Sequence, residues 1–486
     1  MGTRFDLRSA VAFRVAAPGL LVLTLALTLL SSSASEPFLR LRDGTLGYHG
    51  SETDLTNLTE IRIGWFGPTN VDNPLTGDLW WAANLAIREA NAQVASGNKS
   101  SFQGLPLRLV ARWAVDPWGS GVSQLTRMVY DEQPLALLGS VDSATTHLAE
   151  QVVAKANLPL VSPIATDKSI TLAGVSWMFS CAPDEDVIAR VLVADLLASL
   201  EGGMLAPTSP GLREESLPDK SQVLYRKPEP QKTSLALITC TDHESRMTAR
   251  EVMRELSRRG RLPSLRLEVP PAAHEFSKQL AALQEARSDT VLIVAGPEDA
   301  AGLVRALRAA ETAASLAAHS SVAQDPASAA EPANKAGKDE GVGRLRIFGS
   351  HAMSRSRFSE LAGPAAEGVC FPLLFVPDPA HADTSRFLTR FATERHRVPD
   401  YTAALTYDAT RLLIEAIHRA GPNRTRIREE LARLSPWSGI AGTIHFDGTG
   451  QNIRTNICMA TIHDGTIVPV QRLPIQNTKN HNAAKL

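Results

Sequence analysis

The chain has 486 residues, of which 50 are basic and 51 acidic, so its formal net charge is −1 at pH 7. This balance argues against nucleic acid as the main partner, because binding a polyanion requires a concentrated basic face. Apolar residues make up 44% and charged residues 21%, which excludes a largely disordered chain. At about 150 residues per domain, the length allows about three domains.

The first 35 residues have the layout of a secretory signal peptide. Three arginines precede an uncharged apolar run over residues 16–30, and small residues follow at 31–35. The run is short for a membrane span, so we expect cleavage near Ala34 or Ser35 rather than an uncleaved anchor. The mature chain is therefore expected to be exported, periplasmic or extracellular, and soluble, with a polar leader over residues 36–58.

From residue 61 onward, strand and helix patterns alternate. Short apolar runs bounded by turn residues predict strands, and apolar residues recurring near a period of 3.6 predict helices. This alternation predicts an α/β fold with a mostly parallel sheet covered on both faces. The strands are expected at 61–66, 105–111, 135–138 and 158–161, and the helices at 79–95, 123–132 and 143–156.

The alternation resumes after residue 181 and predicts a second α/β sheet. Residues 202–232, rich in proline and charge, and residues 312–343, rich in alanine and serine, read as surface insertions. The strands are expected at 235–239, 265–269, 290–295 and 345–348, and the helices at 187–200, 243–259, 275–286 and 297–310.

The last part of the chain changes from helices to strands. Two Asp-Gly pairs, at residues 447–448 and 464–465, indicate hairpin turns. Residues 471–486 are expected to form a tail. The helices are expected at 385–396, 402–420 and 424–434, and the strands at 442–446, 453–462 and 466–470.

The patterns of the common enzyme classes are missing from the sequence. GxSxG, the Walker A loop, GxGxxG, HExxH and CxxC do not occur, and the 12 histidines do not fall at metal-ligand spacing. We therefore expect a protein that is not an enzyme and that needs no cofactor or metal. The four cysteines allow three complete disulfide pairings, and their spacing does not choose among them.

Two strand ends carry polar groups suited to a small anion. Residues 137–146 run from an apolar strand through Gly139 into a helix that begins at Ser143, and residues 159–166 run from a strand to Thr166. Ligands bind at the carboxyl ends of strands in such sheets, and free N–H groups with hydroxyls can hold a carboxylate. The alternative interpretation is that Ser143 and Thr166 only cap helices.

Short motifs follow one another in a fixed order along residues 60–470. They are Ile61-Arg62-Ile63-Gly64, Gly67-Pro68, Leu75-Thr76-Gly77, Ile87-Arg88-Glu89-Ala90-Asn91, the turn at 139–143, the segment 160–166, Glu367-Gly368-Val369, Tyr407-Asp408-Ala409 and residues 442–448. In this order they resemble the type I periplasmic binding proteins, specifically the branched-chain amino-acid (Leu/Ile/Val) binding branch that serves ABC transporters.

The resemblance implies two doubly wound parallel-sheet lobes joined by three crossovers, with the ligand in the cleft between them. Lobe 1 would comprise residues 60–180 and 374–436, and lobe 2 residues 181–370 and 440–470. The crossovers would fall near Cys181, Cys370 and Gly439. Because the first two would then lie on neighbouring strands, a Cys181–Cys370 disulfide is a hypothesis of this reading.

The resemblance also implies where the ligand's α-carboxylate binds. The matching positions are Ser143 in the first turn and Ile164 and Thr166 in the second segment, with Ala165 between them. An amino group is usually held in lobe 2 by an aromatic and an acidic residue, and this sequence departs from that pattern.

The aromatic place falls on Pro297 or Glu298 and the acidic place near His351. Glu298 could pair with an ammonium group, or be a helix first-turn acid favoured by the dipole. Tyr401 corresponds roughly to a side-chain-pocket aromatic, and Trp81 and Trp118 are candidates for the cleft mouth. Each aromatic side chain could equally serve lobe packing.

Together these patterns predict an exported, monomeric solute-binding protein. It would capture a small molecule, an amino acid or related carboxylate, by hinge closure and deliver it to the membrane permease of an ABC transporter. The alternatives are a ligand-sensing module of a receptor or kinase system, an α/β enzyme, and a degenerate protein that binds nothing.

Overall fold

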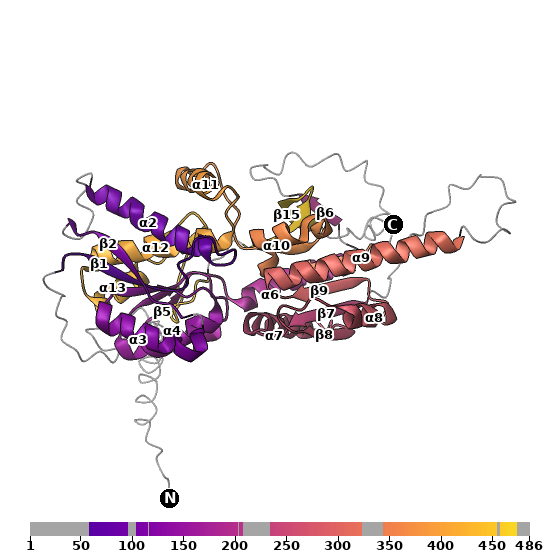
Figure 1. The fold of residues 1–486 in the computed structure, drawn as a ribbon, viewed down its shortest axis with the longest axis horizontal. Coiled ribbons are helices and arrows are strands. Elements are labelled where there is room, and N and C mark those ends of the chain that lie inside the picture. Colours follow the sequence, from indigo (N-terminus) through magenta and orange to yellow (C-terminus); the bar gives the residue numbers. More distant parts are fainter. Residues whose placement is uncertain are drawn as a thin grey trace, which may run out of the picture.

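The computed structural model describes residues 58–95, 104–114, 116–202, 204–207, 234–322, 344–453 and 457–473. Two α/β lobes lie side by side along the long axis of the molecule (Figure 1). The predicted signal peptide, the leader up to residue 57, most of both insertions and residues 474–486 lie outside the described residues. No helix within the described ranges is long and apolar enough to cross a membrane.

The first lobe is built on a five-stranded, fully parallel sheet in the order β2-β1-β3-β4-β5. Most of its strand residues are buried, as expected for a parallel sheet covered by helices on both faces. The strands are β1 (Ile61–Phe66), β2 (Leu107–Ala111), β3 (Ala136–Gly139), β4 (Leu160–Ser162) and β5 (Met178–Ser180).

Helices cover both faces of this sheet. One core lies between the strands and α2 and α12, and a second lies between the strands and α3 and α4. The helical elements are α2 (Gly77–Ala95), η2 (Pro117–Gly121), α3 (Val122–Arg127), η3 (Met128–Glu132), α4 (Ser143–Ala156), α5 (Ser169–Leu172), α11 (Ala382–Arg395), α12 (Tyr401–Ala420) and α13 (Arg424–Arg433).

The second lobe is built on an eight-stranded mixed sheet in the order β6-β15-β14-β11-β10-β9-β7-β8. The five strands from β11 to β8 are parallel, and β14, β15 and β6 continue the sheet in antiparallel pairs. The strands are β6 (Met204–Pro207), β7 (Leu235–Cys240), β8 (Leu265–Val269), β9 (Thr290–Val294), β10 (Arg346–Gly349), β11 (Cys370–Leu373), β14 (Cys458–His463) and β15 (Thr466–Leu473).

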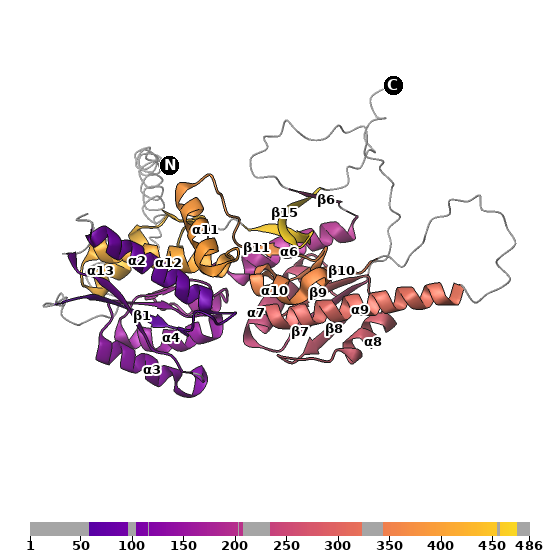
Figure 2. The ribbon, with the colours of Figure 1, turned by 45° about the horizontal axis from the view of Figure 1, so that its top comes forward.

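Helices again cover both faces, with α6 and α7 on one side and α8, α9 and α10 on the other. Helix α9 continues past the expected end at residue 310, and its last turns extend beyond the rest of the lobe (Figure 2). The helical elements are α6 (Glu185–Leu200), α7 (His243–Arg258), α8 (Ser277–Glu285), α9 (Pro297–Val322), η6 (His351–Ser354), α10 (Ser356–Ala362) and η7 (Gly363–Ala366).

Part of the third crossover segment packs differently from the expectation. Ile440, Ile444 and Phe446 belong to the core of the first lobe, although residues 440–470 were expected in the second. The short strands β12 (Trp437–Ser438) and β13 (Thr443–Ile444) pair with each other there. The chain reaches the second sheet only at β14, because the apolar side chains before it fill the first core.

A buried carboxylate fixes the start of this segment to α12. Asp408 accepts hydrogen bonds from the backbone N–H groups of Ile440 (2.9 Å) and Ala441 (2.8 Å). Burial raises the pKa of Asp408 to about 7, although both donors favour the charged form. Gly439 makes this approach feasible, because a Cβ there would lie 2.2 Å from Oδ2 of Asp408.

The Cys181–Cys370 disulfide is not formed. All four cysteines are free thiols, and these two side chains are buried in different cores. Cys181 packs in the main core of the first lobe, whereas Cys370 packs against α6 in the second.

The Asp464-Gly465 hairpin is confirmed. His463 and Thr466 pair across the turn between β14 and β15, and both turn residues have positive φ angles, 49° and 70°. A two-residue turn of this kind requires that backbone conformation, which Asp and Gly tolerate.

Candidate functional site

The first half of the site is the turn between β3 and α4. Asp142 is the N-cap of α4, and its Oδ1 accepts a hydrogen bond from the Thr145 N–H at 2.7 Å. Ser143 therefore does not cap the helix itself, and its N–H and hydroxyl stay available to bond elsewhere. Gly139 allows the turn, because its φ is +126° and a Cβ there would lie 2.8 Å from the carbonyl oxygen of Phe66.

The loop after β4 orients the Ser143 hydroxyl. The backbone N–H groups of Thr166 and Asp167 each donate a hydrogen bond to Ser143 Oγ at 3.2 Å. Since these two donors occupy the lone pairs of the oxygen, the hydroxyl proton points away from the loop. The loop thus orients the Ser143 hydroxyl, which faces the second lobe together with the backbone N–H groups of Ser143 and Ala144.

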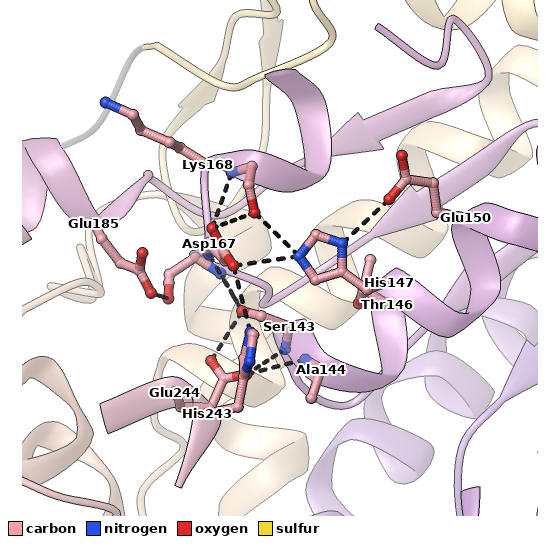
Figure 3. A network of polar contacts seen from close by, with 12 residues as sticks. Ser143, Ala144, Thr146, His147, Glu150, Asp167, Lys168, Glu185, His243 and Glu244 are labelled. Atoms are coloured by element: carbon pink, nitrogen blue, oxygen red, sulfur yellow. Dashed lines mark hydrogen bonds and ion pairs between the residues drawn. The ribbon is translucent and has the colours of Figure 1, made fainter. Parts of the chain in front are cut away.

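Glu244 of the second lobe accepts hydrogen bonds from these three donors, the donor set of the first lobe. Its Oε1 accepts from the N–H groups of Ser143 (2.7 Å) and Ala144 (3.1 Å), and its Oε2 accepts from Ser143 Oγ (2.8 Å) (Figure 3). Burial and the neighbouring Asp142 carboxylate raise the pKa of Glu244 to about 7, while the three donors lower it. A carboxylate from one lobe therefore occupies the donor set of the other.

Helix α7 positions this carboxylate. It begins directly after β7, and its N-cap Asp242 accepts a hydrogen bond from the Ser245 N–H at 2.9 Å. Glu244 lies in the first turn, where the helix dipole favours an acidic side chain. Two helix N-termini, those of α4 and α7, thus face each other across the lobes and share one carboxylate.

A second buried acid lies behind the loop after β4. Glu185 is fully buried, and its Oε1 accepts a hydrogen bond from Thr166 Oγ1 at 3.4 Å. Burial, with the nearby carboxylates of Asp167 and Glu244, raises the pKa of Glu185 to about 9. Its Oε2 has no hydrogen-bond partner among the described residues.

The two other positions expected in the loop point into the first lobe. Ile164 packs in the core with α2 and α12, and Ala165 packs in the core with α3 and α4. The carbonyl oxygen of Ala165 accepts a hydrogen bond from Ser180 Oγ at 3.1 Å. These residues shape the loop, while Ser143 and Thr166 supply polar groups.

Glu298 and Trp81 make their recorded contacts with residues outside the donor set. Glu298, on the first turn of α9, pairs with the Arg357 guanidinium at 2.8 Å, so its charge is already partnered. The Trp81 ring packs against Phe387 and Phe391, and its Nε1–H donates to Glu394 at 2.8 Å. The Glu298 ion pair lies within the second lobe, and the Trp81 contacts lie within the first.

Trp118 lies on η2, and its side chain is 65% exposed. His351 and Tyr401, in contrast, meet between the lobes. His351 starts η6 of the second lobe and Tyr401 starts α12 of the first, and their ring centroids are 5.8 Å apart. Burial lowers the pKa of His351 to about 4, and its Nδ1 has no hydrogen-bond partner among the described residues.

Sequence reasoning missed Glu244 and the histidines around it. A local signal was available, because Cys240, Thr241 and Asp242 lead from an apolar strand into a helix, as Gly139 to Asp142 do in the first lobe. What the sequence does not show is that the two helix starts face each other.

Two α/β lobes, each on its own sheet, and a carboxylate-binding donor set between them define a two-lobed binding protein. The chain belongs to the periplasmic binding protein family: the family's sequence model, described as "Periplasmic binding protein", matches residues 60–334 and 312–466. It is a type I periplasmic binding protein, as its motifs predicted, and its fold is that of the branched-chain amino-acid-binding proteins.

Solved structures with this fold include binding proteins for different small molecules. LivJ of Streptococcus pneumoniae, described in complex with isoleucine, is 16% identical with a TM-score of 0.63, covering 85% of this chain and all of that one. LivK of Thermotoga maritima is 17% identical with a TM-score of 0.62, over 85% and 99%. A solute-binding protein of R. palustris in complex with benzoate is 14% identical with a TM-score of 0.62, over 85% and 98%.

A curated relative, described as "Amino acid binding protein", comes from Pseudomonas aeruginosa. It is 30% identical over 151 residues, which is 29% of this chain and 38% of that protein. The chain thus spans less than half the length of this relative.

Proposed function

We propose that the chain is an exported solute-binding protein that captures a small carboxylate between its lobes and delivers it to an ABC-type permease. The observation that carries this proposal is the convergence of three donors, two from Ser143 and one from Ala144, on a single carboxylate. Backbone N–H groups at a helix start need no rearrangement to bind an anion. The site therefore has the chemistry of a carboxylate receptor.

The ligands of the similar structures support this class of ligand. Isoleucine and benzoate, named for two of them, differ in size, in charge and in the presence of an amino group, but both carry a carboxylate. In this chain the expected ammonium partner Glu298 is paired with Arg357. The proposal accordingly requires a carboxylate and does not require an amino group.

Glu244 has the role of an internal competitor in this proposal. A bound carboxylate must take the positions of Oε1 and Oε2, so the Glu244 side chain has to leave as the ligand enters. The apparent affinity is then the intrinsic affinity multiplied by the fraction of molecules in which Glu244 does not occupy the donors. No covalent step is involved, and one copy of the chain contains both halves of the site.

The test begins with native mass spectrometry of the purified chain, which identifies a co-purified small molecule. Calorimetry with that molecule, isoleucine, leucine and benzoate then compares the wild-type chain with Ser143→Ala. We expect at least about tenfold weaker binding, because a buried carboxylate loses a donor and two N–H groups lose their acceptor.

Ser123→Ala is the matched control, since Ser123 is exposed in the same lobe. It should bind as the wild type does. Equal affinity of the Ser143→Ala and wild-type chains would contradict the assigned site. A wild-type chain that binds no carboxylate and co-purifies with none would contradict the proposed function.

A further inference from the structure

Three side chains beside the donor set bring potential metal-ligating atoms together. His147 lies on α4, Asp167 in the loop before α5, and His243 is the first residue of α7. Asp167 Oδ2 is 3.2 Å from Nε2 of His147 and 3.3 Å from Nε2 of His243 (Figure 3). The three ligating atoms all lie within 4.8 Å of one another.

We propose that His147, Asp167 and His243 bind a divalent transition-metal ion of the zinc class across the two lobes. Bonds of about 2.0–2.1 Å from zinc to nitrogen and oxygen place tetrahedral ligand atoms about 3.3 Å apart. The two N···O distances, 3.2 and 3.3 Å, agree with that separation. Two imidazoles and one carboxylate are also a common protein donor set for zinc, with water as the fourth ligand.

Neighbouring groups orient these ligands as metal sites require. Nδ1 of His147 lies 3.2 Å from Oε2 of Glu150, which leaves Nε2 to face Asp167. Oδ1 of Asp167 accepts hydrogen bonds from the N–H (2.9 Å) and hydroxyl (2.7 Å) of Ser169, which leaves Oδ2 to face the histidines. In metalloproteins, a ligating histidine is oriented in this way by a carboxylate at its other ring nitrogen, and a ligating carboxylate is oriented by hydrogen bonds to its second oxygen.

Access and charge also suit a cation. The Asp167 side chain is 1% exposed, whereas the His147 and His243 side chains are 25% and 38% exposed. The carboxylate is therefore buried, and the site is open to solvent on the side of the histidines. The carboxylates of Asp167 and Glu150 face the histidines. The guanidinium of Arg250 lies 4.0 Å from Oδ1 of Asp167, the oxygen turned away from the rings.

The proposed ion would join the lobes at a place distinct from the carboxylate donors. His147 and Asp167 belong to the first lobe, and His243 belongs to the second. An ion held by all three therefore stabilises the contact between α4 and α7 whatever small molecule the chain carries. The inference stands independently of the proposed carboxylate ligand.

The test measures zinc binding to the full untagged chain after treatment with a chelator. Calorimetry with zinc chloride should show a micromolar or tighter site, and cobalt(II) should give the intense visible absorption of tetrahedral coordination. His147→Ala and His243→Ala should each weaken binding about 100-fold, and Glu150→Gln about tenfold, since it keeps the ligands and alters only their support. Circular dichroism checks that the variants fold.

His463→Ala is the matched control. Glu367, His463 and Asp464 also bring three ligating atoms together, but all three residues belong to one lobe and His463 is 70% exposed. This variant should retain the cobalt spectrum and the tight zinc site. A wild-type chain without micromolar zinc binding would overturn the proposal, as would binding that is lost in His463→Ala and kept in His147→Ala and His243→Ala.

Discussion

Two of the contacts between the lobes differ in the kind of group that each lobe contributes. In the Ser143–Glu244 contact, N–H and O–H donors of the first lobe meet a single carboxylate of the second. In the His351–Tyr401 contact, two rings pack edge to face, and nearby the backbone N–H of Ser356 donates to Asp400 Oδ2 at 3.2 Å.

The proposed function assigns the two contacts different roles. On that proposal, a free carboxylate replaces the Glu244 side chain, because it presents the same two oxygens to the three donors. Nothing comparable in solution replaces the packed rings of His351 and Tyr401. We therefore expect ligand binding to depend on the Ser143–Glu244 contact and the stability of the closed arrangement to depend on the His351–Tyr401 contact.

Removing the Glu244 side chain should have the largest effect on ligand binding. Glu244→Ala should bind small carboxylates about 100-fold more tightly than the wild type, because about 3 kcal/mol of charge-assisted hydrogen bonding no longer opposes the ligand. Calorimetry measures the affinity, and Glu285→Ala, an exposed acid on α8, is the control. Unchanged affinity would mean that Glu244 does not occupy the donors in solution.

The second contact should respond to pH. Burial lowers the pKa of His351 from 6.5 to about 4, so the unfolded chain binds a proton at a higher pH than the folded chain does. The stability that neutral His351 contributes is thus present above pH 6.5 and is lost as the pH falls toward 4, by about 2 kcal/mol between pH 7 and pH 5.

Denaturant unfolding at both pH values measures this loss, and His351→Gln should reduce it because glutamine does not titrate. His274→Gln replaces an exposed histidine of the same lobe and should keep the wild-type pH dependence. The same loss in His351→Gln as in the wild type would contradict the assignment to His351.

The smallest effect is expected at Glu298, which belongs to neither contact. Its ion pair with Arg357 is partly exposed, so Glu298→Gln should lower stability by less than about 1 kcal/mol. Its ligand affinity should equal that of the wild type in the same calorimetric assay. A loss of affinity confined to ligands with an amino group would instead make Glu298 the ammonium partner.

Local signals predicted much of the fold. The helix at Ser143–Ala156 has the expected bounds, since hydroxyl and acidic residues precede a clear apolar period, and Asp464-Gly465 forms the expected hairpin. Local signals fail where distant segments decide the outcome. The packing of Ile440, Ile444 and Phe446 depends on the first core, and Cys181 and Cys370 are buried in the cores of different lobes.

The candidate site could also be predicted only where its residues belong to one short segment. The polar groups at Ser143 and Thr166 could be proposed because each follows a strand within one short segment. Glu244 could not, because its position depends on how two helix starts in different lobes face each other. From the sequence, Trp81 could equally line the cleft mouth or pack within the lobe, and the structure places Phe387 and Phe391 against its ring.

The approach of Gly439 to Asp408 has a consequence for comparisons among related sequences. Any side chain at position 439 would occupy the space of the Asp408 carboxylate, which in turn holds Ile440 and Ala441. The two positions should therefore covary: a relative with a larger residue at the position of Gly439 should also lack the acid at that of Asp408. Such paired replacements in a sequence alignment would identify relatives whose third crossover is held in a different way.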